Sequence, residues 1–176
     1  MRHFLVACIW ACLSFCYAAE FIQLEGVENS YQISPELYRS AQPEREGFTA
    51  LQNLGVRSVL NLREYHKDTR KARHTQLHLM AYPVAAGEVT AADVENCLAL
   101  IARAPKPVLV HCWHGSDRTG IVVAAYRIVF QNWSVAEAEK EFRDERFGYH
   151  EFWYENLLHL LRETDWTAMR GRLKLR

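Results

Sequence analysis

Apolar residues follow two different patterns along the chain, and these predict strands and helices in alternation. Short, nearly continuous apolar runs flanked by turn residues are typical of buried strands, and three such runs are 56–62, 77–82 and 107–111. Longer segments with apolar residues three and four positions apart are typical of amphipathic helices. The segments with this helical spacing are 43–54, 91–103, 118–130 and 149–162.

The remaining segments complete the predicted order of elements. Two short apolar stretches, 27–33 and 37–39, are predicted strands, and the polar segment 64–74 is a helix or a loop. Ser134 and Glu137 have the spacing of a capping box, which predicts the start of one more helix. Strands that alternate with helices predict an α/β fold, in which helices flank a central sheet.

The composition fits one soluble domain. The chain has 176 residues, 49% of them hydrophobic and 24% charged, and its formal net charge at pH 7 is zero. This length allows a sizeable core, and no repeat, linker or low-complexity tract divides the chain. Without a basic excess we expect no nucleic-acid binding. The short basic segment 170–176 is predicted to fray in solvent, with a membrane contact as the alternative.

The N-terminal residues carry a separate signal. Arg2 precedes an apolar stretch at 4–17, which is too short for a convincing membrane span, and the residues before Ala19 suit a signal peptidase. We therefore predict a signal peptide at 1–18, cleaved after Ala18 or Ala19, and a periplasmic or secreted mature domain at 19–176. An uncleaved anchor or a first core strand is the alternative.

Cleavage there would leave only two of the five cysteines, Cys97 and Cys112. A scaffold of structural disulfides cannot be made from one spare cysteine. Cys97 falls on the predicted helix 91–103, on the same face as Leu98 and Ile101, so we expect a packing residue. The alternative is a reversible disulfide between Cys97 and Cys112.

One ten-residue segment, HCWHGSDRTG at 111–120, carries the candidate chemistry. It joins the predicted strand 107–111 to the N-terminus of the predicted helix 118–130. Backbone N–H groups of such a loop can converge on an anion, and the helix end adds unpaired donors and partial positive charge. Gly115 permits a positive φ within the turn. The segment therefore predicts a phosphate-binding loop.

The same loop supplies a nucleophile. Its donors, the helix end and Arg118 all favour the thiolate form of Cys112, so we expect a nucleophilic sulfur at neutral pH. The guanidinium of Arg118 can bind two phosphoryl oxygens and stabilise transition-state charge, and Thr119 can donate a hydrogen bond to the sulfur. The alternatives are a cysteine that only packs and a rhodanese-type sulfur carrier, against which the Arg-Thr-Gly ending argues.

The loop resembles the HCxxGxxR[ST]G signature of the protein tyrosine and dual-specificity phosphatases. Two earlier segments, LYRSAQP at 37–43 and LGVRSVLNLR at 54–63, resemble the front half of compact bacterial, fungal and plant members. The layout over about 31–161 is similar to the periplasmic dual-specificity phosphatases of Gram-negative bacteria. The resemblance implies a compact cysteine-phosphatase fold with a central, mostly parallel sheet, no cofactor, and Cys112 and Arg118 as nucleophile and phosphate clamp.

The general acid is where the chain departs from this family pattern. That group protonates the leaving oxygen and later activates water, and relatives usually carry an aspartate for it. The corresponding segment 81–89 offers only Glu88. Asp117, inside the loop, is the second candidate, as is thought for the Asp-Arg-Thr loops of myotubularin-like lipid phosphatases. The plainer interpretations are that Glu88 is a solvated charge before the N-cap Thr90 and that Asp117 braces the loop.

Further loop residues are expected to bind the substrate. Trp113 and His114 are predicted at the rim of the pocket, within reach of a bound molecule. Gly115, Ser116 and Thr119 are predicted to surround the phosphate.

Other candidates receive structural interpretations. His111 is expected to fix the loop by hydrogen bonding, and His111, Cys112 and His114 lack a second ligand pair, so no metal site is predicted. The basic segment 66–74 is expected to be a solvated face or to attract a highly phosphorylated substrate. A group of aromatic residues at helical spacing is predicted to belong to the core. Its members are Phe147, Tyr149, Phe152, Trp153 and Tyr154.

Three functions remain open at this point. The first is an exported, monomeric phosphatase that hydrolyses phosphotyrosine, and also phosphoserine or phosphothreonine, in a protein or small phosphate ester through a phosphocysteine intermediate. The second is a phosphatase for inositol phosphates or phosphoinositides. The third is a weakly active phosphate-binding module, which only the missing acid favours.

Overall fold

A six-stranded sheet forms the centre of the molecule. The computed structural model describes residues 18–174, so the predicted signal peptide lies outside the described residues except for Ala18. The strand order is β1-β2-β3-β6-β4-β5. The strands are β1 (Glu20–Phe21), β2 (Tyr31–Ser34), β3 (Leu37–Ser40), β4 (Ser58–Asn61), β5 (His78–Ala81) and β6 (Val108–His111).

The sheet is mostly parallel, as predicted. β3, β6, β4 and β5 run parallel to one another, and β1 and β2 add an antiparallel edge. The parallel strands β4 and β6 are buried at every position, as expected for strands covered on both faces.

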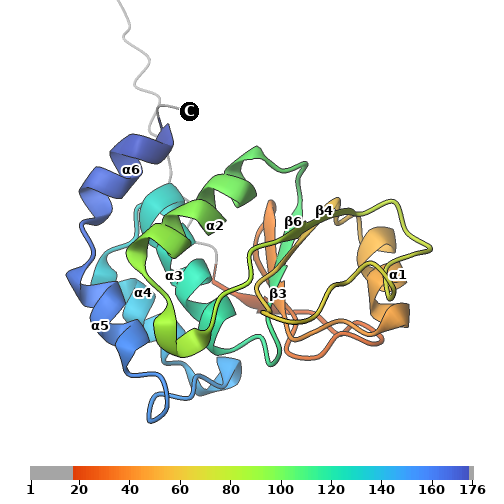
Figure 1. Cartoon of the computed structure of the whole chain (residues 1–176), viewed down its shortest axis with the longest axis horizontal. Helices are drawn as coiled ribbons and strands as arrows, with labels where there is room; N and C mark the ends of the chain where they lie inside the picture. The colour runs from red at the N-terminus through yellow and green to blue at the C-terminus, as the bar shows by residue number, and fades with distance from the viewer. Residues whose placement is uncertain (1–17, 175–176) are drawn as a thin grey trace, which may run out of the picture.

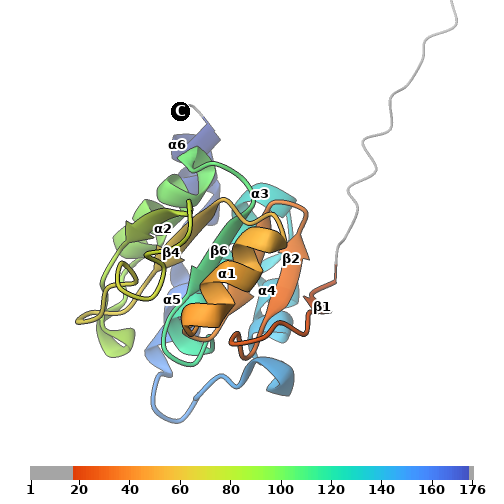
Figure 2. The same ribbon diagram turned by 90° about the vertical axis from the view of Figure 1, so that its right-hand side faces the viewer.

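Helices cover the two faces unequally (Figure 1). One helix, α1 (Arg45–Asn53), lies alone on one face, where Figure 2 shows it in front of the sheet. The other face is covered by α2 (Ala91–Arg103), α3 (Asp117–Gln131), α4 (Val135–Phe142), α5 (Asn156–Glu163) and α6 (Trp166–Lys174). Two short 3-10 turns, η1 (Ala86–Glu88) and η2 (Glu145–Phe147), lie between these helices in sequence. The α/β prediction is therefore confirmed.

Helix α3 is the centre of the larger core. It packs against α2, α4, α5 and α6 as well as the sheet, which is why nearly all of its residues are buried. Close packing reaches its first turn, where a Cβ at Gly120 would overlap the ring of Phe142 in α4. The N-terminus of α3 is thus held in place from several sides.

Two predictions about the C-terminal third are wrong. The helix predicted at 149–162 begins only at Asn156, since Gly148 with φ +67° ends η2 and turns follow it. The basic segment 170–176 does not fray as far as residue 174. It belongs to α6, in which Leu173 is buried and Arg172 pairs with Glu95 at 2.7 Å. The core thus extends beyond 31–161.

None of the helices in residues 18–174 has both the length and the apolarity that a transmembrane span requires.

Candidate active site

The predicted loop joins β6 to α3. Cys112 follows the last residue of β6 and is 2% exposed, and α3 begins five positions later at Asp117. Gly115 adopts φ +74°. A Cβ there would also lie 2.5 Å from the backbone oxygen of Ser40. Glycine is therefore required both by conformation and by the close approach of β3, as the sequence predicted for the turn.

Arg39, near the end of β3, supports the loop. The buried guanidinium of Arg39 donates to the carbonyl oxygen of Gly115 at 2.6 Å and lies 4.2 Å from the ring centre of Phe147. Burial lowers the pKa of Arg39 to about 10, and the charges of Glu141 and Cys112 oppose that shift. This contact explains what the Leu-Tyr-Arg-Ser motif does in the structure: its arginine holds the carbonyl group of Gly115 in place.

A second buried network fixes the start of the loop. His111 is fully buried, with Nδ1 3.1 Å from the carbonyl oxygen of Cys112 and Nε2 2.9 Å from Asp68 Oδ2. Both ring nitrogens of this buried side chain thus contact polar groups of the loop or its support. The predicted role of His111 in fixing the loop is confirmed.

Asp68 links that histidine to an arginine. Its Oδ1 accepts a hydrogen bond from Arg63 at 3.2 Å, and both side chains are buried. Burial alone would raise the pKa of Asp68, but the hydrogen bond and charge of His111 and the charge of Arg63 outweigh it, so the pKa lies below its ordinary value. The carboxylate therefore stays ionised and holds both His111 and Arg63 beside the loop.

Arg118 reaches across the loop to a neighbouring segment. It donates to the carbonyl oxygen of Val84 at 3.1 Å, and Glu64 lies 4.0 Å from the same nitrogen. Its side chain keeps 17% exposure. The guanidinium is thus positioned by protein groups while part of it still faces the cavity.

A cavity of about 570 Å³ opens at the loop. The structure brings four of the predicted site residues to its wall, Trp113, His114, Asp117 and Arg118. Side chains from other segments complete it. These are His66, Ala86, His150, Trp153 and Tyr154.

The remaining predicted residues, Cys112 and Gly115 among them, do not line this cavity. Glu88 is exposed at the end of η1. Ser116 and Thr119 are buried. The hydroxyl of Thr119 has no hydrogen-bond partner within residues 18–174, so the expected bond to the sulfur is not formed. A buried donor left without an acceptor is costly, and this one is available to an anion bound in the loop.

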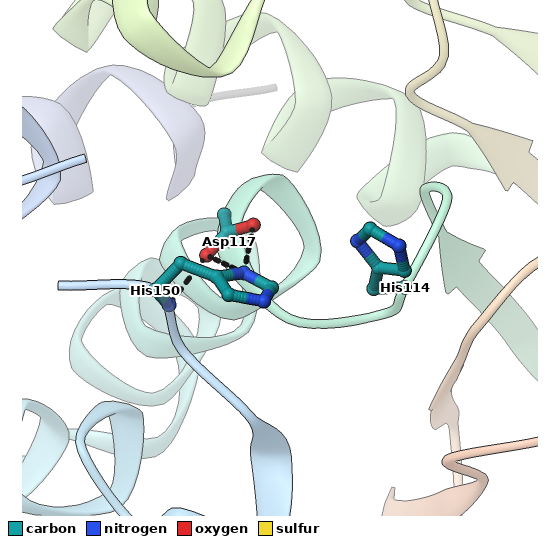
Figure 3. A group of neighbouring side chains, drawn as sticks. All are labelled: His114, Asp117 and His150. Atoms are coloured by element: carbon teal, nitrogen blue, oxygen red, sulfur yellow. Dashed lines mark hydrogen bonds and ion pairs between the residues drawn. The ribbon is translucent and has the colours of Figure 1, made fainter. Parts of the chain in front are cut away.

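Asp117 is engaged by a residue that the sequence did not single out (Figure 3). His150 donates its backbone N–H to Asp117 Oδ1 at 2.9 Å, and its Nδ1 lies 3.0 Å from Oδ2. The side chain of Asp117 is 8% exposed and that of His150 44%. These contacts pair Asp117 with donors of a neighbouring segment, which is what the bracing interpretation expects.

Sequence reasoning missed the whole contribution of residues 148–154. Phe147 is buried as predicted, but Phe152 and Trp153 are 89% and 74% exposed. Because this segment is not helical, the helical spacing of its aromatic residues had no meaning. The His150 N–H bond to Asp117 is a contact between residues 33 apart, which no local pattern could indicate.

The second cysteine behaves as predicted. Cys97 is buried in α2, and both Cys97 and Cys112 are free thiols. Burial, with a smaller contribution from Asp93, raises the pKa of Cys97 to about 12. A thiol in this state is a packing group and not a reactive one.

The chain belongs to the tyrosine phosphatase family, whose model matches residues 27–158. The fold comparison agrees. A crystal structure of TpbA from Pseudomonas aeruginosa in complex with pTyr aligns with a TM-score of 0.80 at 30% identity, over 92% of this chain and 98% of that one. The predicted family and fold are confirmed.

Among individual relatives, the dual specificity protein phosphatase TpbA of Pseudomonas aeruginosa is 38% identical over 124 residues. The match covers 68% of this chain and 56% of TpbA, so it spans little more than half of that relative. The inositol diphosphatase DSP5 of Arabidopsis thaliana is 29% identical over 124 residues, 65% of this chain and 60% of that protein.

Proposed function

We propose that this chain is an exported, cysteine-dependent phosphatase that hydrolyses phosphotyrosine monoesters, and also phosphoserine and phosphothreonine, through a phosphocysteine intermediate. The observation that carries the proposal is the loop itself. Cys112 directly follows a buried strand, α3 begins five residues later, and Arg118, in the first turn of α3, lines the cavity that opens at the loop. These groups together suit a phosphoryl dianion and its attack by sulfur.

The reaction would proceed in two displacements. The Cys112 thiolate attacks phosphorus, an S–P bond forms, and the bond to the ester oxygen breaks as that oxygen takes a proton from a donor in the pocket. Water then attacks the phosphocysteine, gives a proton back to that group, and the S–P bond breaks to release phosphate. Loop N–H groups and Arg118 bind the equatorial oxygens in both transition states.

The position of Asp117 supports it over Glu88 as the source of that proton. Asp117 lies on the cavity wall beside Arg118, whereas Glu88 is exposed and outside the wall. Since an alkyl leaving group needs protonation more than a phenyl one, Asp117→Asn should slow alkyl phosphate hydrolysis much more than phenyl phosphate hydrolysis. Equal losses would exclude Asp117, and Glu88→Gln is the matched comparison.

The walls of the cavity support an aromatic phosphate ester. Trp113, Trp153 and Tyr154 surround the loop with flat apolar surface on which a phenyl ring can stack. TpbA, which shares this fold, has been crystallised with pTyr.

An inositol phosphate is the second candidate substrate. It is favoured by the similarity to the inositol diphosphatase DSP5 and by the exposed cations of segment 66–74. Lys67, Arg70 and Arg73 are exposed there, and His66 lines the cavity. Such charges would attract a substrate with several phosphates.

The deciding experiment is a substrate panel assayed with the mature chain and with Cys112→Ser. Phosphotyrosine peptides should be hydrolysed fastest, and Cys112→Ser should abolish measurable turnover because oxygen is a far weaker nucleophile here than a thiolate. Faster hydrolysis of inositol phosphates would select the second candidate. Turnover that survives Cys112→Ser would refute the mechanism.

Export is tested separately. The predicted signal peptide should be cleaved after Ala18 or Ala19 when the full chain is produced in a Gram-negative host, which N-terminal mass analysis of the periplasmic fraction would reveal. An intact N-terminus on chain held in the cytoplasm would reject this part of the proposal.

A further inference from the structure

Three potential metal ligands meet at the mouth of the cavity. His114, Asp117 and His150 each offer one ligand atom, and the three atoms lie within 4.8 Å of one another. They come from three places: the loop after β6, the first residue of α3, and the segment between η2 and α5 (Figure 3). The sequence predicted no metal site because His150 is distant in the chain from the other two.

The side chains are suited to a cation by chemistry as well as by distance. Two imidazoles and one carboxylate are a ligand set that zinc uses when it keeps a fourth position open. Asp117 Oδ2 and His150 Nδ1 are 3.0 Å apart, and two ligands of a tetrahedral zinc with bonds of about 2.0–2.1 Å are separated by roughly 3.3 Å. Two of the three ligands therefore already have nearly the required spacing.

The third ligand, His114, has a side chain that can move towards the other two. His114 is exposed, and neither of its ring nitrogens has a hydrogen-bond partner within residues 18–174. Its ring centre lies 5.5 Å from that of His150. A rotation of one exposed side chain is enough to bring three ligands around one ion.

We propose that His114, Asp117 and His150 form a binding site for a divalent transition-metal cation and that Zn²⁺ binds there best. We further propose that the bound ion blocks hydrolysis of the substrate. The cation replaces the hydrogen bond between Asp117 and Nδ1 of His150, and the neutral imidazole then carries its one hydrogen on Nε2. Its open fourth position faces the cavity, where water or a phosphate oxygen completes the tetrahedron.

Blocking follows from where the ion lies. Asp117 and Arg118 are adjacent in α3 and share the cavity wall, so an ion on Asp117 occupies the mouth and removes the carboxylate from proton transfer. The charge of Arg118 opposes a dication, which makes the site weaker than a closed four-ligand structural site. Only the inhibition rests on the proposed function, because binding of the ion requires no turnover.

The binding test uses Cys112→Ser, which removes the thiol as a competing ligand. Calorimetric titration with zinc chloride should give one ion per chain, and Co²⁺ should give the visible absorption of a tetrahedral complex. Mg²⁺ should not bind, since it prefers an octahedral set of oxygen ligands. No zinc binding to Cys112→Ser would overturn the proposal, because the ion would then belong to the sulfur.

Two variants and a matched control identify the ligands. In the same background, His114→Ala and His150→Ala should each weaken zinc binding by at least about tenfold, since even outer-shell changes cost 10–100-fold. His159→Ala, an exposed histidine of α5, should bind as tightly as its parent. Should His150→Ala fail to fold, His114→Ala still decides, because that ring forms no hydrogen bond within residues 18–174. Undiminished affinity in His114→Ala would overturn the site.

The inhibition test uses the chain with Cys112 intact. The zinc concentration that halves phosphate ester hydrolysis should equal the dissociation constant, and a chelator should restore the rate. Full turnover with the site saturated would refute the block. A chain that binds zinc at these residues but hydrolyses no ester would instead refute the proposed function and leave the metal site standing.

Discussion

The base and the rim of the cavity are built in opposite ways. The base consists of the loop residues His111, Cys112 and Gly115 with their supports Arg39, Arg63 and Asp68, which are all buried behind the cavity wall. The rim consists of side chains that are largely exposed. Its members are His66, Trp113, His114, His150 and Trp153.

The difference separates two physical tasks. The polar contacts of the base are hydrogen bonds and ion pairs between buried groups, where leaving one partner unpaired costs several kcal/mol. The rim makes few bonds that folding depends on, so its side chains can meet a ligand. We therefore expect changes in the base to appear as lost stability and changes in the rim as altered binding.

The largest effect is expected for Arg39→Ala. It leaves the carbonyl oxygen of Gly115 without its buried donor and empties the space against Phe147, so the free energy of unfolding should fall by about 3–5 kcal/mol. Urea denaturation followed by circular dichroism measures it. Arg57→Ala, an exposed arginine of the same sheet region, should change stability by no more than about 0.5 kcal/mol. Similar losses for both variants would erase the distinction between buried base and exposed surface.

A smaller effect, with a pH signature, is expected for Asp68→Asn. The variant loses the buried charge between His111 and Arg63, which should cost about 3 kcal/mol at pH 7. Because the folded-state pKa lies below the ordinary value of 3.8, ionised Asp68 stabilises the fold above about pH 4, and this contribution is lost as the pH falls through the folded-state pKa.

The difference in unfolding free energy between the parent and Asp68→Asn should therefore shrink on acidification. Urea midpoints at pH 7, 5 and 3.5 would measure it. A difference that stays constant or grows towards acid would contradict the assignment of Asp68 as an ionised member of the base.

The smallest effect on stability is expected at the rim, for Trp153→Ala. Its side chain is 74% exposed, so the unfolding free energy should change by at most about 0.5 kcal/mol. Loss of aromatic stacking worth about 0.5–1.5 kcal/mol should still lower kcat/KM for a phosphotyrosine peptide by roughly 2–10-fold. Phe152→Ala, its exposed neighbour outside the cavity wall, is the control and should match the parent. Equal kinetic losses in both would remove Trp153 from substrate recognition.

Features that depend on neighbouring residues could be predicted from the sequence. The loop at 111–120, the helix at Ala91–Arg103 and the capping box at Ser134 depend on neighbouring residues, and the structure confirms all three as local features. The parallel sheet follows from the alternation of such elements.

The rest depends on contacts between distant segments. Arg39 and Asp68 stand in ordinary polar surroundings in the sequence, and only the fold buries them against Gly115 and His111. The helix predicted at 149–162 begins too early because aromatic spacing cannot indicate that residues 149–155 form turns and that Asp117 binds His150. A local pattern therefore predicted the nucleophilic loop but not the residues around its mouth.

The place of β6 in the sheet also governs how the protein is made. β6 (Val108–His111) lies between β3 and β4, although both come earlier in the chain. During synthesis, β3 and β4 therefore wait as unpaired edges, which are prone to wrong pairing, until the later strand inserts and satisfies both. Such distant pairings are slow steps of folding. Cys112 follows that strand directly. In a refolding experiment, phosphatase activity should therefore return when β6 pairs with β3 and β4, and a kinetic assay would measure the rate of that step.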